Sequence, residues 1–312
     1  MTLHIICFGA LNIDRLYRVD KIAGRGEERR ILGVNEQPGG SAANTAVGLA
    51  RLGLKVGFIG KVANDREGKI LISDLEKEGI DVKGVKVSSS GRSGVVNGYV
   101  DQHGERALYV DPGVNDTLTL RDIDLSWVSS ARFLHLTSFV GEKPFEAQIQ
   151  LVERLPKNVR VSLDPGHLYA IKGLKRLEPI IRRCNILIPN EKELKLLTGK
   201  GPEEGAETLL SYGVSVVAVK LGHKGCYVTN GEEKHWLRTF KVKVVDTTGA
   251  GDAFCAGFLY GIIKDMSIKD SGILGNYIAS RCITKSGARA GLPYISEINL
   301  AKIYELYGGS VG

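Results

Sequence analysis

The most informative stretch of this sequence, residues 246–254, reads DTTGAGDAF. It follows the apolar run Val242–Val245, which predicts a strand, and leads into a predicted helix of small residues over Ala253–Ile263. Gly249 and Gly251 let the backbone approach a ligand where a Cβ would clash. The amides of this turn would face outward at a helix start, and that arrangement favours an anion such as phosphate.

Asp252 needs a separate explanation, because a carboxylate inside an anion-binding turn repels phosphate. Its position suits a general base that takes a proton from a hydroxyl group attacking the phosphate. The structural alternative is a glycine-rich helix entry with Asp252 as the cap. This stretch by itself leaves both interpretations open.

Length and composition indicate an ordinary globular chain: 312 residues, 43% of them hydrophobic and 25% charged. No run approaches the ~20 apolar residues of a membrane span, and the N-terminus lacks the pattern of a secretory signal. We therefore expect a cytoplasmic protein, and few Gln and Met beside many Lys, Glu and Arg favour a thermophile. The cysteines are widely spaced, as expected of reduced core residues rather than disulfides or a metal site. They are Cys7, Cys184, Cys226, Cys255 and Cys282.

The net charge of +7 is spread among acidic residues without a basic block. Nucleic-acid and membrane partners are therefore not expected, and an anionic small molecule explains the excess as well.

Short Val- and Ile-rich runs alternate with helical patterns. This order predicts a doubly wound, mostly parallel α/β sheet covered by helices on both faces, followed by helices from Gly251 to Tyr307. A hairpin is expected where Asn230-Gly231 separates two short strands. The predicted strands are Ile5–Phe8, Val56–Val62, Phe133–Leu136, Val159–Leu163, Ile186–Ile188 and Val214–Val219. The predicted helices are Ala42–Leu52, Gly68–Glu78, Phe145–Arg154, Leu174–Arg183, Glu191–Leu197 and Glu203–Ser211.

Two segments, at about 15–37 and 93–110, interrupt this alternation within a single domain spanning 1–312. Their Val- and Tyr-rich strands need a surface to cover, so we interpret them as a small β-sheet lid over the carboxyl edge of the main sheet. Plain surface excursions are the alternative.

A second stretch, residues 37–53, reads QPGGSAANTAVGLARLG. Gly39 and Gly40 predict a tight bend, Ser41 a helix N-cap, and Asn44 an amide available to a hydroxylated ligand. A closely packed helix with a glycine hinge is the alternative.

A third stretch, Gly9–Asp14, lies just past the first predicted strand, where ligands bind in open α/β sheets. Asn12 and Asp14 could hold vicinal hydroxyl groups there, although both residue types are also common in turns.

Together the three stretches resemble the PfkB family of ribokinase-like carbohydrate kinases, from about Ile5 to about Pro293. The resemblance implies transfer of the terminal phosphoryl group of ATP, or of ADP, to a hydroxyl of a ribose-like sugar. It makes Asp252 the base and the Gly249, Ala250 and Gly251 amides the anion hole. The implied sugar-binding positions are Asn12, Asp14, Gly39, Gly40 and Asn44.

The same resemblance implies the nucleotide and metal positions. Asn190 and Glu193 match an Asn-x-x-Glu motif that helps to hold Mg²⁺ and phosphates through water, and Asp164 joins that network. Lys220 stands where many members carry Thr, either near the donor phosphates or paired with an acid. The other implied nucleotide-binding residues are Gly222, Gly225 and Asn276.

A monovalent cation, K⁺, is implied at Asp246 and Thr248. Its other ligands would be carbonyls near Cys282 and Gly287, with Gly291 closing the site.

One departure from the family pattern concerns the acceptor. Ribokinases place a Glu after the strand where this chain has Thr137 and Ser138, which puts simple ribose in doubt. Arginine forks suit phosphate, so an already phosphorylated sugar such as ribose 1-phosphate is one alternative, and solvated lid charges are the other reading. The lid arginines are Arg25, Arg29, Arg30, Arg92 and Arg106.

Two further alternatives stay open. A nucleoside such as adenosine, inosine or cytidine could stack on Phe139, Tyr99 or Tyr109. Outside the enzyme class, the fold could serve a non-catalytic nucleotide- or sugar-binding regulator. Lid sheets often pair in these relatives, so a homodimer through Val95, Val96 and Tyr109 is also expected.

Overall fold

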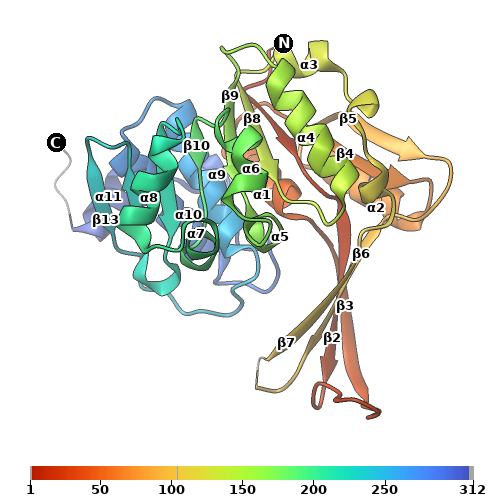
Figure 1. The fold of residues 1–312 in the computed structure, drawn as a ribbon. Coiled ribbons are helices and arrows are strands. Elements are labelled where there is room, and N and C mark those ends of the chain that lie inside the picture. The colour runs from red at the N-terminus through yellow and green to blue at the C-terminus, as the bar shows by residue number, and fades with distance from the viewer. Residues whose placement is uncertain (1, 104, 309–312) are drawn as a thin grey trace.

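The computed structural model describes residues 2–103 and 105–308. Its main body is a nine-stranded sheet with helices on both faces (Figure 1). Across the sheet, all neighbouring strands between β11 and β5 pair in parallel, whereas β12 and β13 form an antiparallel edge next to β11. The predicted doubly wound, mostly parallel sheet is therefore confirmed. The order across the sheet is β13 (Lys234–Leu237), β12 (Cys226–Thr229), β11 (Val216–Lys220), β10 (Ile186–Leu187), β9 (Arg160–Asp164), β8 (Phe133–Thr137), β1 (Ile5–Phe8), β4 (Val56–Ala63) and β5 (Asp81–Ser88).

Two apolar layers enclose the sheet, because successive side chains of each strand point to opposite faces. In β1, Ile5 and Cys7 join one layer, and Ile6 and Phe8 join the other. The first layer packs against α1 (Ser41–Arg51), α2 (Arg66–Lys77), α9 (Ala250–Ile263), α10 (Ile268–Cys282) and α11 (Leu300–Tyr307). The second packs against α3 (Leu125–Ser129), α4 (Glu142–Arg154), α5 (Gly166–Ala170), α6 (Leu174–Ile181), α7 (Glu191–Thr198) and α8 (Pro202–Ser211).

A separate four-stranded sheet projects from the main body as an arm (Figure 1). Its order is β3 (Ile31–Gly39), β2 (Asn12–Val19), β6 (Gly94–Val100) and β7 (Arg106–Asp111). The inner end of β2 follows β1 almost directly, so this sheet begins at the carboxyl edge of the main one. Several of its large apolar side chains are exposed, namely Ile31, Leu32, Val34, Leu108, Tyr109 and Val110.

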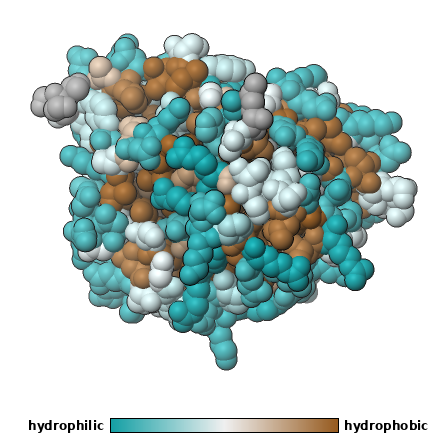
Figure 2. Space-filling model, turned by 90° about the horizontal axis from the view of Figure 1, so that it is seen from above, coloured by the Kyte–Doolittle hydropathy of each residue, from teal (hydrophilic) through white to brown (hydrophobic). Residues whose placement is uncertain are grey.

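The surface seen from above in Figure 2 carries apolar side chains in several patches separated by hydrophilic ones. Across the described residues, no helix has both the length and the apolar character needed to cross a membrane. All five cysteines are buried and free, as predicted.

The predicted strand at Val242–Val245 is wrong. Among the described residues, no strand pairs with this segment. Instead the Val245 amide donates to the carbonyl of Ile283, just past α10. Val242 and Val244 line a cavity, so their apolar side chains form a cavity wall rather than part of a buried strand.

The Asn230-Gly231 hairpin is confirmed, but its loop spans four residues between β12 and β13 instead of a two-residue turn. Asn230 Oδ1 accepts from the amides of Glu232 and Glu233, which favours this longer loop.

Candidate active site

The turn at the start of α9 has the backbone that its glycines predict. Gly249 is left-handed, with φ of 77°. A Cβ on it would lie 2.6 Å from the Cβ of Ala288, so a larger residue does not fit. Asp252 then falls in the first turn of α9, beside the amide groups that the helix leaves unpaired.

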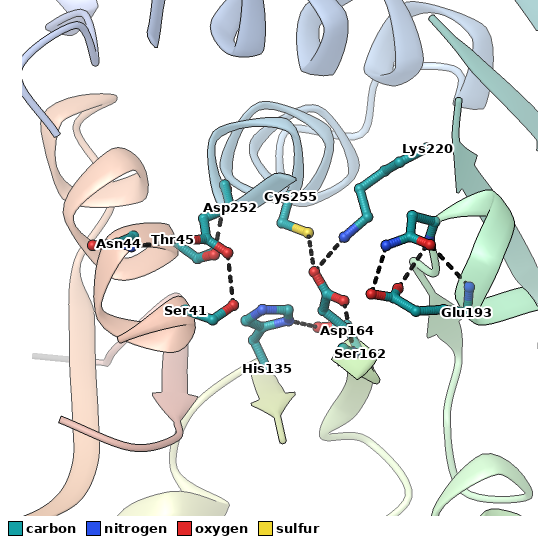
Figure 3. Close-up of polar contacts among 12 residues, drawn as sticks. Ser41, Asn44, Thr45, His135, Ser162, Asp164, Glu193, Lys220, Asp252 and Cys255 are labelled. Atoms are coloured by element: carbon teal, nitrogen blue, oxygen red, sulfur yellow. Dashed lines mark hydrogen bonds and ion pairs between the residues drawn. The ribbon is translucent and has the colours of Figure 1, made fainter. Parts of the chain in front are cut away.

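The side chain of Asp252 is held by two donors from α1 (Figure 3). The Ser41 hydroxyl lies 2.6 Å from Oδ1, and the Asn44 amide nitrogen lies 2.8 Å from Oδ2. Burial raises the pKa of Asp252 to about 6, although the two hydrogen bonds oppose the rise. Ser41 and Asn44 lie 211 and 208 positions before Asp252 in the sequence, so two distant stretches form one site.

The prediction of Ser41 as an N-cap is wrong. Gly40 occupies the cap position with φ of 103°, and Ser41 is the first helical residue. Its hydroxyl is therefore free of capping and donates to Asp252.

Asp14 and Asn12 lie at the inner end of β2, next to Gly39 of β3. A Cβ on Gly39 would lie 2.1 Å from Asp14 Oδ2, so glycine is required to leave room for that carboxylate. Burial raises the pKa of Asp14 to about 6, Arg289 lowers it, and the charge of Asp252 raises it further. The Asn12 carbonyl oxygen accepts from the Asn115 amide at 3.1 Å, which leaves the Asn12 amide nitrogen as the group available to a ligand.

A buried ionic cluster lies on the other side of Asp252 (Figure 3). Lys220 Nζ is 2.5 Å from Asp164 Oδ2, and the Cys255 thiol donates to the same oxygen at 3.3 Å. Burial raises the pKa of Glu193 to about 7, and the charge of Asp164 adds to the rise. Burial alone would lower the pKa of Lys220, but Asp164, Cys255 and Glu193 together outweigh it and raise the pKa.

Asn190 and Glu193 form a capping box at the start of α7. Glu193 accepts from the Asn190 backbone amide at 2.8 Å and from its side-chain amide at 2.6 Å, and Asn190 caps the Glu193 amide at 2.9 Å. The Asn-x-x-Glu spacing therefore has a local structural reason, and it also places a buried carboxylate beside Asp164.

A cavity of about 450 Å³ gathers most of the predicted nucleotide-binding residues. The predicted residues that line it are Lys220, Gly222, Gly225, Asn276, Ala250 and Gly251. Asn276 donates to the carbonyls of Leu237 and Arg238, so it holds the segment that forms one wall of the cavity. Most of the other residues that line the cavity are apolar, such as Phe240, Val244 and Phe254, and such a lining suits the flat ring of a nucleotide base.

Asp246 organises the loop before α9. It accepts from the Thr248 amide and hydroxyl at 2.9 and 2.7 Å, and from the Gly287 amide at 2.9 Å. A Cβ on Gly291 would lie 2.3 Å from the Cys282 carbonyl oxygen. The segments expected to supply cation ligands therefore do lie against one another.

Arg29 does not join these residues. It lies in the loop between β2 and β3, at the outer end of the small sheet, and pairs with Glu27 at 2.9 Å. At about 3.3 Å per residue, β2 places that loop about 20 Å beyond Asn12. Arg92 is likewise paired, with Asp111 at 2.6 Å. The side chain of Arg106 lies outside the described part of the structure.

Several contributors to the site carried no signal in the sequence. Arg289 contacts Asn44, Cys255 contacts Asp164, and Asn115 contacts Asn12. Arg289 lies between Gly287 and Gly291 and Cys255 directly follows residues 246–254, but no pattern there marks these two side chains, and only the tertiary fold brings them and Asn115 to the site.

Comparison with known proteins agrees with this geometry. The pfkB family carbohydrate kinase model matches residues 2–295. A protein described as an uncharacterized sugar kinase of Archaeoglobus fulgidus is 44% identical over 250 residues, which cover 79% of this chain and 98% of the relative. The ATP-dependent ribose-1-phosphate kinase of Halopiger xanaduensis is 32% identical over 287 residues, 92% of this chain and 94% of the relative.

Among solved structures, the ribokinase of Thermotoga maritima matches with a TM-score of 0.86 at 33% identity, over 97% of this chain and 99% of the other. The chain therefore belongs to the pfkB family of carbohydrate kinases. The predicted ribokinase-like fold and the predicted class, a phosphotransferase acting on a sugar hydroxyl, are confirmed.

Proposed function

We propose that this chain transfers the terminal phosphoryl group of ATP to a hydroxyl of a ribose-like sugar. The observation that carries the proposal is the position of Asp252, held between Ser41 and Asn44 on one side and the Gly249–Gly251 turn on the other. The ribokinase of Arabidopsis thaliana, whose structure holds ribose and ATP, has the same fold with a TM-score of 0.85 at 25% identity.

Asp252 acts as the general base. Its carboxylate takes the proton of the acceptor hydroxyl as the oxygen attacks the terminal phosphorus. Ser41 and Asn44 keep both carboxylate oxygens aimed into the site and favour the ionised form. Asn12 and Asp14 hold the neighbouring sugar hydroxyls, one as a donor and the other as an acceptor.

The nucleotide base occupies the cavity between Phe240, Val244 and Phe254, and the phosphates extend toward Gly251. The Gly249, Ala250 and Gly251 amides stabilise charge on the transferred group. Lys220 supplies a positive charge at the same place, since its Nζ lies 3.5 Å from the position of a Cβ on Gly251. Asn190 lies on the side of the site where the phosphates bind, because its side-chain amide is hydrogen-bonded to Glu193.

Asp164 and Glu193 fit Mg²⁺ held through water, because burial and the charge of Asp164 raise the pKa of Glu193 and a further cation beside it would favour the ionised form. Asp164 and Glu193 would hold this metal through water, and its charge would offset that of the donor phosphates. Asp246 and Thr248 fit a neighbouring K⁺ through the carbonyls of their loop, while the Asp246 carboxylate keeps that loop in shape.

A phosphorylated acceptor, ribose 1-phosphate, is the second candidate. It is favoured by the name of the Halopiger xanaduensis relative and by Thr137 and Ser138, which stand where ribokinases carry a Glu. The pairing of Arg29 with Glu27 argues against a ready-made lid clamp for its phosphate. Nucleosides follow as a third class of acceptor.

The small sheet acts as a lid over the acceptor and excludes water. Its exposed apolar residues, such as Val34, Leu108 and Tyr109, fit a homodimer in which two small sheets cover each other. Buried free cysteines fit the reducing cytoplasm.

The experiment that tests the function is phosphoryl transfer by the purified protein with Mg²⁺, with and without K⁺, and with ATP or ADP. The acceptors are ribose, ribose 1-phosphate, fructose 6-phosphate, adenosine, inosine and cytidine. Turnover on ribose supports the proposal. Turnover on ribose 1-phosphate alone transfers it to the second candidate, and nucleotide binding without turnover on any acceptor contradicts it in favour of a binding regulator.

A further inference from the structure

Arg289 reaches from the loop after α10 into the space between α1 and α2, and its side chain is only 12% exposed. Its Nε donates to Asn44 Oδ1 at 2.7 Å, and one terminal nitrogen lies 3.4 Å from the Gly39 carbonyl oxygen. The other terminal nitrogen forms an ion pair with Asp74 of α2. A single guanidinium group thus contacts two segments that carry predicted sugar-binding residues.

The contact with Asn44 decides which way its amide faces. A side-chain amide has one accepting oxygen and two donating hydrogens. Here the oxygen is taken by Arg289 and one hydrogen by Asp252 Oδ2. The flipped amide would set its NH₂ against a guanidinium and its oxygen against a carboxylate, so both hydrogen bonds would be replaced by repulsive contacts.

We propose that Arg289 is a positioning residue that fixes Asn44 as a hydrogen-bond donor to the Asp252 carboxylate and to the acceptor. The inference rests on the proposed function, and it adds the direction of the hydrogen bonds. Asn44 has one amide hydrogen left for the substrate, so it can donate to the acceptor oxygen beside it. The hydroxyl proton is then free to go to Asp252, which is the direction that proton abstraction requires.

Asp74 and the fold keep Arg289 in this orientation. A buried guanidinium needs a counterion, and the planar fork allows Asp74 and Asn44 to be engaged together. Burial lowers the pKa of Arg289 and Asp74 opposes this. A lysine in this place would keep the charge without the fixed geometry.

Arg51 offers a matched control. It holds the same loop, because its guanidinium donates to the carbonyls of Arg289 and Leu292 at 2.7 and 3.1 Å. It also pairs with Glu78 just after α2, at 2.6 Å, and is 13% exposed. It therefore matches Arg289 in burial, loop contact and ion pairing, and none of its hydrogen bonds goes to Asn44.

The test compares the kinetics of Arg289→Met with those of Arg51→Met. Arg289→Met should raise the KM for the acceptor and lower kcat, each by roughly 10-fold, because an amide contact to a charged group is lost. The KM for nucleotide should stay within about 3-fold, since the cavity is untouched. Arg51→Met should leave the acceptor KM within the same limit. Equal kinetic losses in both variants would reduce Arg289 to a loop support and overturn the proposal.

A double-mutant cycle asks whether Arg289 acts through Asn44. Added to Asn44→Ala, the Arg289→Met change should cost less than about 3-fold in kcat/KM, whereas independent action would cost the full effect of roughly 100-fold. If Arg289→Met does not fold, Arg289→Lys replaces it, and a wild-type acceptor KM in that variant would contradict the need for the guanidinium fork.

A measurement without turnover separates this inference from the proposed function. The carboxyl carbon of Asp252 is titrated by ¹³C NMR and identified by its loss in Asp252→Asn. Its pKa should rise in Arg289→Met, which frees Asn44 to turn away, and stay unchanged in Arg51→Met. The neighbouring groups Asp14, Asp164, Glu193, Lys220, Cys255 and Cys282 are present in both variants, but only Arg289→Met removes the charge that lowers the pKa of Asp14. The same titration in Asn44→Ala separates this charge effect, because Arg289→Met should no longer change the pKa of Asp252 there if it acts through Asn44. An inactive wild type with this pKa difference would refute only the function, and an unchanged pKa would refute the role of Arg289.

Discussion

Lys220 and Asp164 form an ion pair almost out of reach of solvent, with side-chain exposures of 13% and 7% and an N–O distance of 2.5 Å. The sequence left open whether this lysine pairs with an acid or faces the donor phosphates. It does pair with an acid, and it also lines the nucleotide cavity. The same ammonium group also lowers the pKa of the neighbouring Glu193, which burial and the charge of Asp164 raise to about 7.

Removing this cation should make stability depend on pH. In Lys220→Met, Asp164 and Glu193 remain buried without a counterion, and breaking such a pair costs about 3–5 kcal/mol. Carboxylates with raised pKa values in the folded state bind more protons than in the unfolded state, so stability is lost as pH rises. Urea unfolding at pH 6 and pH 8 should show the larger loss at pH 8. Lys224→Met, an exposed neighbour, is the control, and an equal loss at both pH values would contradict the prediction.

Asp252→Asn should abolish proton abstraction while leaving the cavity intact. We expect kcat to fall by at least ~100-fold, the low end for loss of a general base, with nucleotide affinity unchanged. Calorimetry with a nucleotide and steady-state kinetics check the two halves. Glu207→Gln, an exposed change on α8, serves as the control. A near-wild-type rate in Asp252→Asn would remove this residue from the mechanism.

The pH profile should report the donors to Asp252. Because its pKa is about 6, kcat/KM should rise with pH up to that value and then level off. The Ser41 hydrogen bond lowers this pKa, so Ser41→Ala should shift the rising limb to higher pH and cost more activity at pH 6 than at pH 8. Thr45→Val removes a bond to the Asp252 backbone carbonyl only and should keep the limb in place. A parallel loss at every pH in Ser41→Ala would refute the assignment.

Asp14→Asn should abolish acceptor binding and stabilise the folded protein. The folded-state pKa of Asp14 is raised to about 6, so its ionisation opposes folding progressively between about pH 4 and pH 6, and fully above that. Removing the charge should stabilise the protein at pH 8 by about 1–2 kcal/mol after allowance for solvent, with no gain at pH 3. Thermal unfolding at the two pH values tests this. Acceptor binding should be lost in the same variant, and retained binding would count against the role of Asp14.

The parts of the fold that sequence could predict were those with a local cause. The spacing of apolar residues and the positions of glycines located the main strands and helices, because strands that are buried on both faces are uniformly apolar. Val242–Val245 defeated the same rule, since a cavity wall and a buried strand present the same residue types. Apolar composition alone does not report whether a neighbouring strand is available to pair.

In the candidate site, too, the residues that could be predicted were those marked by a local pattern in the sequence. Asp252 and its glycines stand in one short stretch, and Asn190 and Glu193 are three residues apart, so spacing revealed them. Arg289 lies 245 positions from Asn44, and although Gly287 and Gly291 flank it, nothing in their spacing points to a contact with Asn44. For Arg29, the sequence located the segment that carries it, but it did not show how far along the strand that segment lies from the site.

The continuity of β2 has a mechanical consequence. Asn12 and Asp14 sit at its inner end, while its outer end carries the exposed loop of the arm, and both neighbours hold it in register along most of its length. A strand braced in this way transmits displacement instead of absorbing it. A tilt of the arm would therefore move Asn12 and Asp14, the two side chains proposed to hold the acceptor, together with the distant tip.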